Sequence, residues 1–125
     1  MKTLLQIGIL ATLALVTGFA HAQTMDDYCV QVSELADELD LSLAKMTITV
    51  PASLSPAERD VIFGYLTEIG VIQNPVRHDA CFSANLAAAH VAVERGYAKQ
   101  HQLLKAMAAY VTHVQAENRR AQAAR

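Results

Sequence analysis

The fold class is decided by residues 24–46, TMDDYCVQVSELADELDLSLAKM. At 100° per residue, the apolar side chains of this stretch gather within an arc of about 100°, and carboxylates occupy the rest of the surface. Thr24 can cap the first turn, and Asp26 and Asp27 follow it at the positive end of the helix. The apolar arc consists of Tyr28, Val32, Leu35, Ala36, Leu39, Leu43 and Met46. The stretch therefore predicts an amphipathic helix with one buried face.

A second helix start follows after a short link. The β-branched residues 47–50 lead into Pro51, which favours an extended connection. Ser55 is then an N-cap, Pro56 suits the first helical position, and Glu58 completes a capping box. This pattern predicts a helix from residue 56 to Ile69, which Gly70 is placed to end.

Asn74-Pro75 repeats the cap-then-proline signal and predicts a third helix over residues 75–95. From there to residue 121 only Gly96 interrupts helical composition. We expect a break near Gly96 and a fourth helix over residues 97–121, although the sequence leaves open whether the helix is continuous through this glycine. Residues 122–125 are expected to fray. The predicted fold is an all-α, small four-helix bundle.

Residues 1–22 have the pattern of a signal peptide. Lys2 precedes an apolar run, and Ala20-His21-Ala22 offers the small-x-small motif that signal peptidase cleaves. We expect cleavage before Gln23, a helical domain over residues 23–121, no transmembrane anchor after cleavage, and a location in the periplasm.

Two cysteines remain in the exported chain, Cys29 and Cys81. An even count in an oxidising compartment predicts one disulfide, here between the first and third predicted helices. The spacing is neither Cys-x-x-Cys nor a haem-attachment motif, so redox catalysis and covalent haem are disfavoured.

Charge is distributed unevenly along the chain. Residues 23–68 carry nine acidic against two basic side chains, and residues 69–125 carry seven basic against three acidic side chains. The two halves either neutralise each other across a packed seam or meet different partners. Nucleic-acid binding is not expected, because the one basic cluster, near Arg119 and Arg120, has no interleaved aromatic residues.

Two His–Glu pairs have the i, i+4 spacing of metal ligands: His90 with Glu94, and His113 with Glu117. A tight metal site needs three or four ligands, so solvated neighbours are the simpler interpretation. No serine lies in a glycine-flanked elbow, and no glycine-rich phosphate loop is present in the sequence. We therefore expect that the protein is not an enzyme and that it binds no cofactor.

Apolar residues outside the predicted core are the better indication of function, since grouped exposed apolar side chains mark partner surfaces. They could also simply close the ends of the bundle. The candidates are Val30, Leu41, Ile48, Val50, Val71 and Ile72.

Three functions fit these patterns. The first is a non-catalytic periplasmic interaction protein that binds another envelope protein as an inhibitor, immunity factor or secretion and assembly accessory. The second is a holdase chaperone for acid or envelope stress. The third is a metal-binding or metal-sensing protein that uses the His–Glu pairs. The sequence is also compatible with a homodimer.

Overall fold

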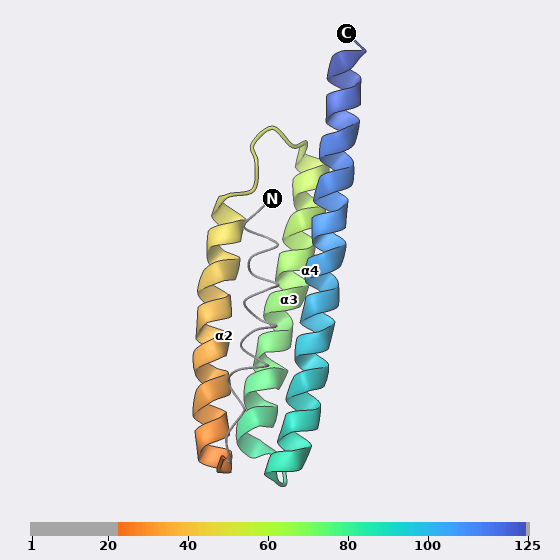
Figure 1. Cartoon of the computed structure of the whole chain (residues 1–125). Helices are drawn as coiled ribbons and strands as arrows, with labels where there is room; N and C mark the ends of the chain where they lie inside the picture. The colour runs from red at the N-terminus through yellow and green to blue at the C-terminus, as the bar shows by residue number, and fades with distance from the viewer. Residues whose placement is uncertain (1–22, 125) are drawn as a thin grey trace.

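A computed structural model describes residues 23–124, which form three α-helices and no strand (Figure 1). The helices are α2 (Met25–Ile48), α3 (Pro56–Phe82) and α4 (Leu86–Ala123). The all-α class is confirmed, but this part of the chain holds three helices where we predicted four. The predicted signal peptide at residues 1–22 and the last residue of the predicted tail lie outside the described residues.

Local capping signals fix where the helices begin. Thr24 and Asp27 form a capping box at α2, and Ser55 and Glu58 form the predicted one at α3. In the α3 box, the backbone N–H of Ser55 donates to Glu58 Oε1 at 2.8 Å, and the N–H of Glu58 donates to Ser55 Oγ at 3.1 Å. Both predicted starts are therefore correct.

The predicted break around Gly70 and Asn74-Pro75 is wrong, because α3 runs through all three residues. Proline lacks an N–H, so Pro75 costs the helix one i→i−4 hydrogen bond. Tertiary packing outweighs this loss, since Ile69, Gln73 and Val76 continue one buried face across the proline. Pro75 itself lies exposed on the outside of the helix.

Gly96 does not break α4, which is continuous from residue 86 to residue 123. The glycine instead lies where α4 packs closely against Val76 of α3. A Cβ atom at position 96 would lie 2.5 Å from Cγ2 of Val76. The absent side chain therefore lets two long helices pack tightly at this point.

The chain turns at residues 83–85, inside the helix that we predicted over residues 75–95. Ser83 has an extended backbone, with φ −70° and ψ 160°. Asn85 then caps α4 by accepting a hydrogen bond from the N–H of Ala88 at 2.8 Å. At the other end α4 continues to Ala123, so the helix includes two residues of the predicted frayed tail.

The helix α3 lies between α2 and α4 and packs against both (Figure 1). Two hydrophobic clusters fill the bundle. One, the aliphatic half, lies at the end of the α2–α3 loop and consists of Leu39, Leu43, Met46, Leu54, Ile62, Leu66, Ile69, Leu104, Met107, Val111 and Val114. The other, the disulfide half, consists of Tyr28, Val32, Val76, Ala80, Ala89, Val93 and Tyr97.

A buried polar layer connects the three helices near the junction of these halves. Gln100 Nε2 of α4 donates to Gln73 Oε1 of α3 at 2.7 Å and to the carbonyl of Ile69 at 3.0 Å. Gln73 Nε2 in turn donates to the carbonyl of Ala36 in α2 at 2.8 Å. Both glutamines are almost fully buried. Because these bonds need the side chains at one level, the layer fixes the axial register of the helices.

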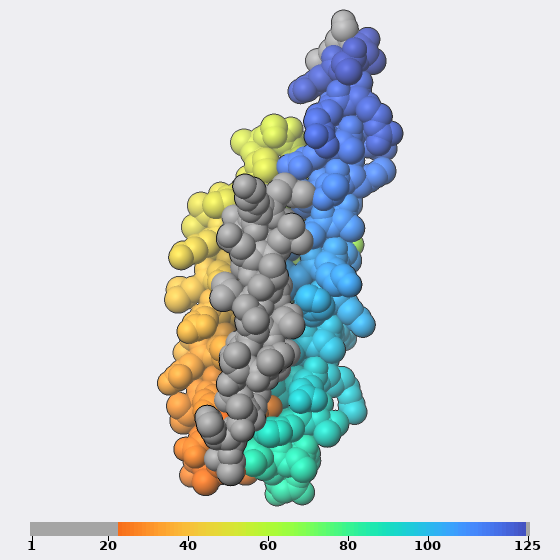
Figure 2. All heavy atoms as spheres, viewed as in Figure 1, coloured from red at the N-terminus to blue at the C-terminus, as the bar shows by residue number. Residues whose placement is uncertain are grey.

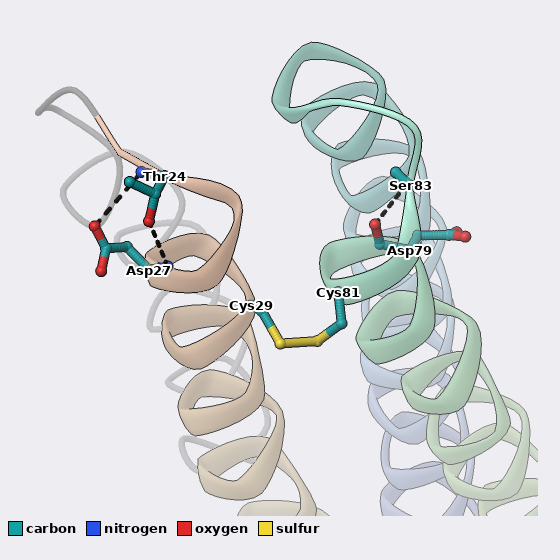
Figure 3. Close-up of a disulfide and its surroundings, with 6 residues drawn as sticks. All are labelled: Thr24, Asp27, Cys29, Asp79, Cys81 and Ser83. Atoms are coloured by element: carbon teal, nitrogen blue, oxygen red, sulfur yellow. Dashed lines mark hydrogen bonds between the residues drawn. A yellow bond between two sulfur atoms is a disulfide. The ribbon is translucent and has the colours of Figure 1, made fainter.

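Cys29 and Cys81 lie at disulfide distance, with 2.03 Å between the sulfurs and 4.6 Å between the Cα atoms. Figure 3 shows the bond joining the first turns of α2 to the last turn of α3. The predicted pairing is confirmed, and α3 is the helix that carries Cys81.

Candidate interaction surface

The face of α2 that points away from the core carries three large apolar side chains, Val30, Leu41 and Ile48. Their exposed fractions are 54%, 66% and 83%. Spacings of 11 and 7 residues return to nearly the same angle on an α-helix, so the three lie along one line. The line is about 27 Å long at 1.5 Å per residue. We call this line and the carboxylates beside it, Glu34 and Glu38, the α2 face.

A groove borders the α2 face at the seam with α3. It has a volume of about 360 Å³. Ala44, which belongs to its lining, is three residues after Leu41 and four before Ile48, so it neighbours both on the helix surface. The opposite wall includes Phe63 and Gly70 of α3. An incoming side chain could therefore enter this groove while its backbone contacts the apolar line.

The six predicted surface residues do not form one patch. Val71 is exposed on α3, away from the α2 face. Val50 is partly buried against the aliphatic half, and Ile72 is partly buried against the disulfide half. These two residues therefore cover the core, which fits the alternative that such apolar residues close the ends of the bundle.

Within residues 23–124, three further large apolar side chains are exposed that the sequence did not indicate: Val61, Phe82 and Val91. Phe82 is 75% exposed at the end of α3, where its ring lies 5.2 Å from that of His78. It follows Val71 by 11 residues, the spacing that also relates Val30 to Leu41. That spacing could have identified it once α3 was treated as a single helix.

The electrostatics of the surface are dominated by α2, which has six acidic side chains and only Lys45 as a base. One arginine compensates two of these acids: the guanidinium of Arg77 contacts Asp37 at 2.9 Å and Asp40 at 2.5 Å. The hydrogen bond to Asp40 is the main cause that raises the pKa of Arg77. Among the described residues these are the only ion pairs between helices, so most of the acidic charge of α2 faces solvent.

The two predicted metal pairs lie far apart. His113 Nε2 is 3.3 Å from Glu117 Oε1 on the exposed side of α4. His90 instead packs against the ring of Tyr28, with 4.4 Å between centroids. Twenty-three residues of straight helix separate the two histidines, about 35 Å. Within residues 23–124 no three His, Cys, Asp or Glu side chains gather as a metal site would require.

A larger hollow, about 590 Å³, lies where α4 extends past the α2–α3 loop. Figure 2 shows this end of α4 projecting beyond the rest of the bundle. Its lining combines Ser53 and Ser55 of the loop region with Asn118 and Arg119 of α4. These side chains can offer hydrogen bonds to a ligand, and the lining also includes the carboxylate of Glu58, which belongs to the capping box of α3.

No protein-family model, curated protein sequence or solved structure matches the chain. In the part of the chain that the structure describes, no helix is long and apolar enough to cross a membrane.

Proposed function

We propose that the protein is a non-catalytic interaction protein of the periplasm, which binds another envelope protein through the α2 face. One observation carries the proposal: Leu41 and Ile48 are exposed on a helix whose other side is fully packed. Large apolar side chains in that setting stabilise a complex and contribute nothing to the core. Inhibition, immunity, and accessory roles in secretion or assembly all require such a surface.

Export to the periplasm is part of the proposal. The cleavage motif at residues 20–22 supports it. The cysteine pair also supports it, since structural disulfides persist in oxidising compartments. The bond ties α2 to α3, so it would present the α2 face on a scaffold that is already ordered. Such preorganisation reduces the entropy lost on binding.

Affinity capture from periplasmic extract of the native host tests the proposal. The bait is the oxidised protein, compared with Leu41→Ser/Ile48→Ser. The matched control is Val71→Ser, because Val71 is 63% exposed but lies on α3. We expect a stoichiometric partner with the wild type and the control, and its loss with the double variant. Failure to recover any partner, or equal recovery by all three baits, would contradict the proposal.

A specific observation favours an acid-stress holdase as the second candidate. The interhelical ion pairs of α2 depend on two carboxylates, Asp37 and Asp40, bound to Arg77. Loss of this contact in acid would loosen α2, while the disulfide keeps it attached. An apolar dye should then bind at about pH 4 and below. Absence of new dye binding there, or of protection of an aggregating client, would exclude this function.

A further inference from the structure

The two outer helices of the bundle carry opposite charge, and within residues 23–124 no ion pair joins one of these helices to the other. Six acidic residues and one basic residue lie on α2, whereas five basic and two acidic residues lie on α4. These helices flank α3 and have few contacts with each other. The ion pairs of Arg77 join α2 to α3, and in the described part of the chain no lysine or arginine of α4 forms an ion pair. Among these residues, Arg77 is therefore the one basic side chain of the second half that pairs with acidic side chains of the first half.

The outward side of α4 carries basic and small side chains. Arg95 and Lys105 are exposed there, and neither forms an ion pair among the described residues. Between them and beside them lie Ala98, Ala109 and the 56% exposed Val91. We call these five residues the α4 face. Small side chains in such a row let a second helix approach closely.

We propose that the α2 face of one molecule binds the α4 face of a second copy of the same chain. The large side chains of Val30, Leu41 and Ile48 would pack over the alanines of α4. Carboxylates such as Glu34 and Glu38 would meet Arg95 and Lys105, so both charged surfaces gain ion-pair partners that they do not have among residues 23–124 of their own molecule.

The two faces lie on different helices, so the contact is heterologous: each copy uses one face and leaves the other free. Association therefore proceeds beyond a dimer into short chains or a closed ring. The inference rests on the proposed function in that it uses the same α2 face. Self-association would hide this face, and an envelope partner would have to compete for it.

Complementary charge reversals test the contact. Glu34→Lys/Glu38→Lys reverses the charge of the α2 face alone, and Arg95→Glu/Lys105→Glu reverses the charge of the α4 face alone. By sedimentation velocity, we expect the wild type to form oligomers, each double variant to be monomeric, and their equimolar mixture to form oligomers again. The mixture associates because each face of one variant, native or reversed, then meets a face of opposite charge on the other variant.

A third variant controls for the change in net charge. Asp60→Lys/Glu68→Lys makes the same reversal on exposed residues of α3 and should still form oligomers. For the wild type, raising the ionic strength from about 0.01 M to about 1 M shortens the Debye length from about 30 Å to about 3 Å. We expect association to weaken by about tenfold or more. A wild type that stays monomeric at low salt, or a mixture that stays monomeric, would overturn the inference.

The outcomes separate this inference from the proposed function. A monomeric wild type that still captures an envelope protein through Leu41 and Ile48 would overturn self-association alone. Oligomers that dissociate as predicted, from a protein that captures no envelope protein, would overturn the proposed function alone.

Discussion

In the disulfide half, two tyrosines pack with valines and alanines beside a covalent bond, whereas in the aliphatic half leucines, isoleucines and methionines pack with no covalent link. Short side chains bury little apolar area, so the disulfide half gains less from the hydrophobic effect per residue. The disulfide compensates for this smaller gain by restricting the unfolded chain. The two ends of this small bundle are therefore stabilised by different means.

Removal of the disulfide should have the largest effect. The cysteines are 52 residues apart, and closing a loop of that length contributes about 4 kcal/mol in the chain-entropy model. We expect Cys29→Ser/Cys81→Ser to lose most of this amount in urea unfolding followed by circular dichroism. Wild type treated with reductant should behave like the double variant. A loss below about 1 kcal/mol would mean that the apolar contacts of the disulfide half suffice alone.

The polar layer gives the next largest effect. Gln100→Leu leaves the buried Oε1 of Gln73 without the donor that it now has at 2.7 Å, which should cost about 1–3 kcal/mol. Gln73→Leu/Gln100→Leu removes both polar groups, so we expect its free energy of unfolding to return close to that of the wild type. Denaturant unfolding of the single and double variants measures the difference. If the double variant has a lower free energy of unfolding than the single variant, the polar layer stabilises the fold in addition to setting the register of the helices.

Substitutions at glycine distinguish close packing from open helix surface. Gly96→Ala places a Cβ 2.5 Å from Val76 Cγ2, and we expect a net loss of about 1–2 kcal/mol after the gain in helix propensity. Gly64 and Gly70 have no atom within 4 Å of an added Cβ, so alanine there should stabilise the protein by about 0.5–1 kcal/mol. Thermal unfolding of the three variants tests the contrast, and a stabilising Gly96→Ala would show that α3 and α4 can separate at no cost.

The smallest expected effect is that of alkaline pH, which should destabilise the disulfide half. At neutral pH this effect on stability is absent. Burial raises the pKa of Tyr97 to about 12, and burial is also the main cause that raises the pKa of Tyr28. Because both folded-state values are raised, the stabilising contribution is complete below the ordinary tyrosine pKa of about 10 and is lost as the pH rises towards 12. Phenolate absorbance followed with circular dichroism measures this loss.

The hydroxyl of Tyr97 is buried and has no hydrogen-bond partner among the described residues. Tyr97→Phe should therefore be neutral or stabilising by up to about 1 kcal/mol, and should reduce the alkaline loss. Tyr65→Phe, in the aliphatic half, is the matched control and should leave that loss unchanged. If Tyr65→Phe reduced the alkaline loss of stability and Tyr97→Phe did not, that loss would originate in the aliphatic half, which would contradict the prediction.

Local sequence signals predicted the helix starts at Thr24 and Ser55 and the pairing of Cys29 with Cys81, because each depends on nearby atoms or on simple chemistry. The signals at Pro75 and Gly96 misled for a common reason. At both positions the energy of packing between helices outweighs the local preference of one residue, and that packing involves residues far away in the sequence.

The exposure of the candidate surface residues was predicted only in part. Val30 and Leu41 could be assigned to the outside of α2, since the helical period of that stretch is clear. The interior position of Val50 and Ile72 depends on how the loop and α3 fold, which the sequence did not give correctly. The burial of Gln73 and Gln100 was not predicted. A polar residue can be assigned to the core only when the spacing of buried positions along its helix, every three or four residues, is already known.

Hydrogen exchange of oxidised and reduced protein, read by mass spectrometry at peptide level, tests most directly whether the two halves are held differently. Openings that separate Cys29 from Cys81 should become easier after reduction, whereas openings confined to the aliphatic half should not. We predict faster exchange near Tyr28, Ala80 and Val93, with protection around Leu66 and Met107 largely retained. An equal loss of protection at both ends would contradict the account, because the bundle would then open only as one unit.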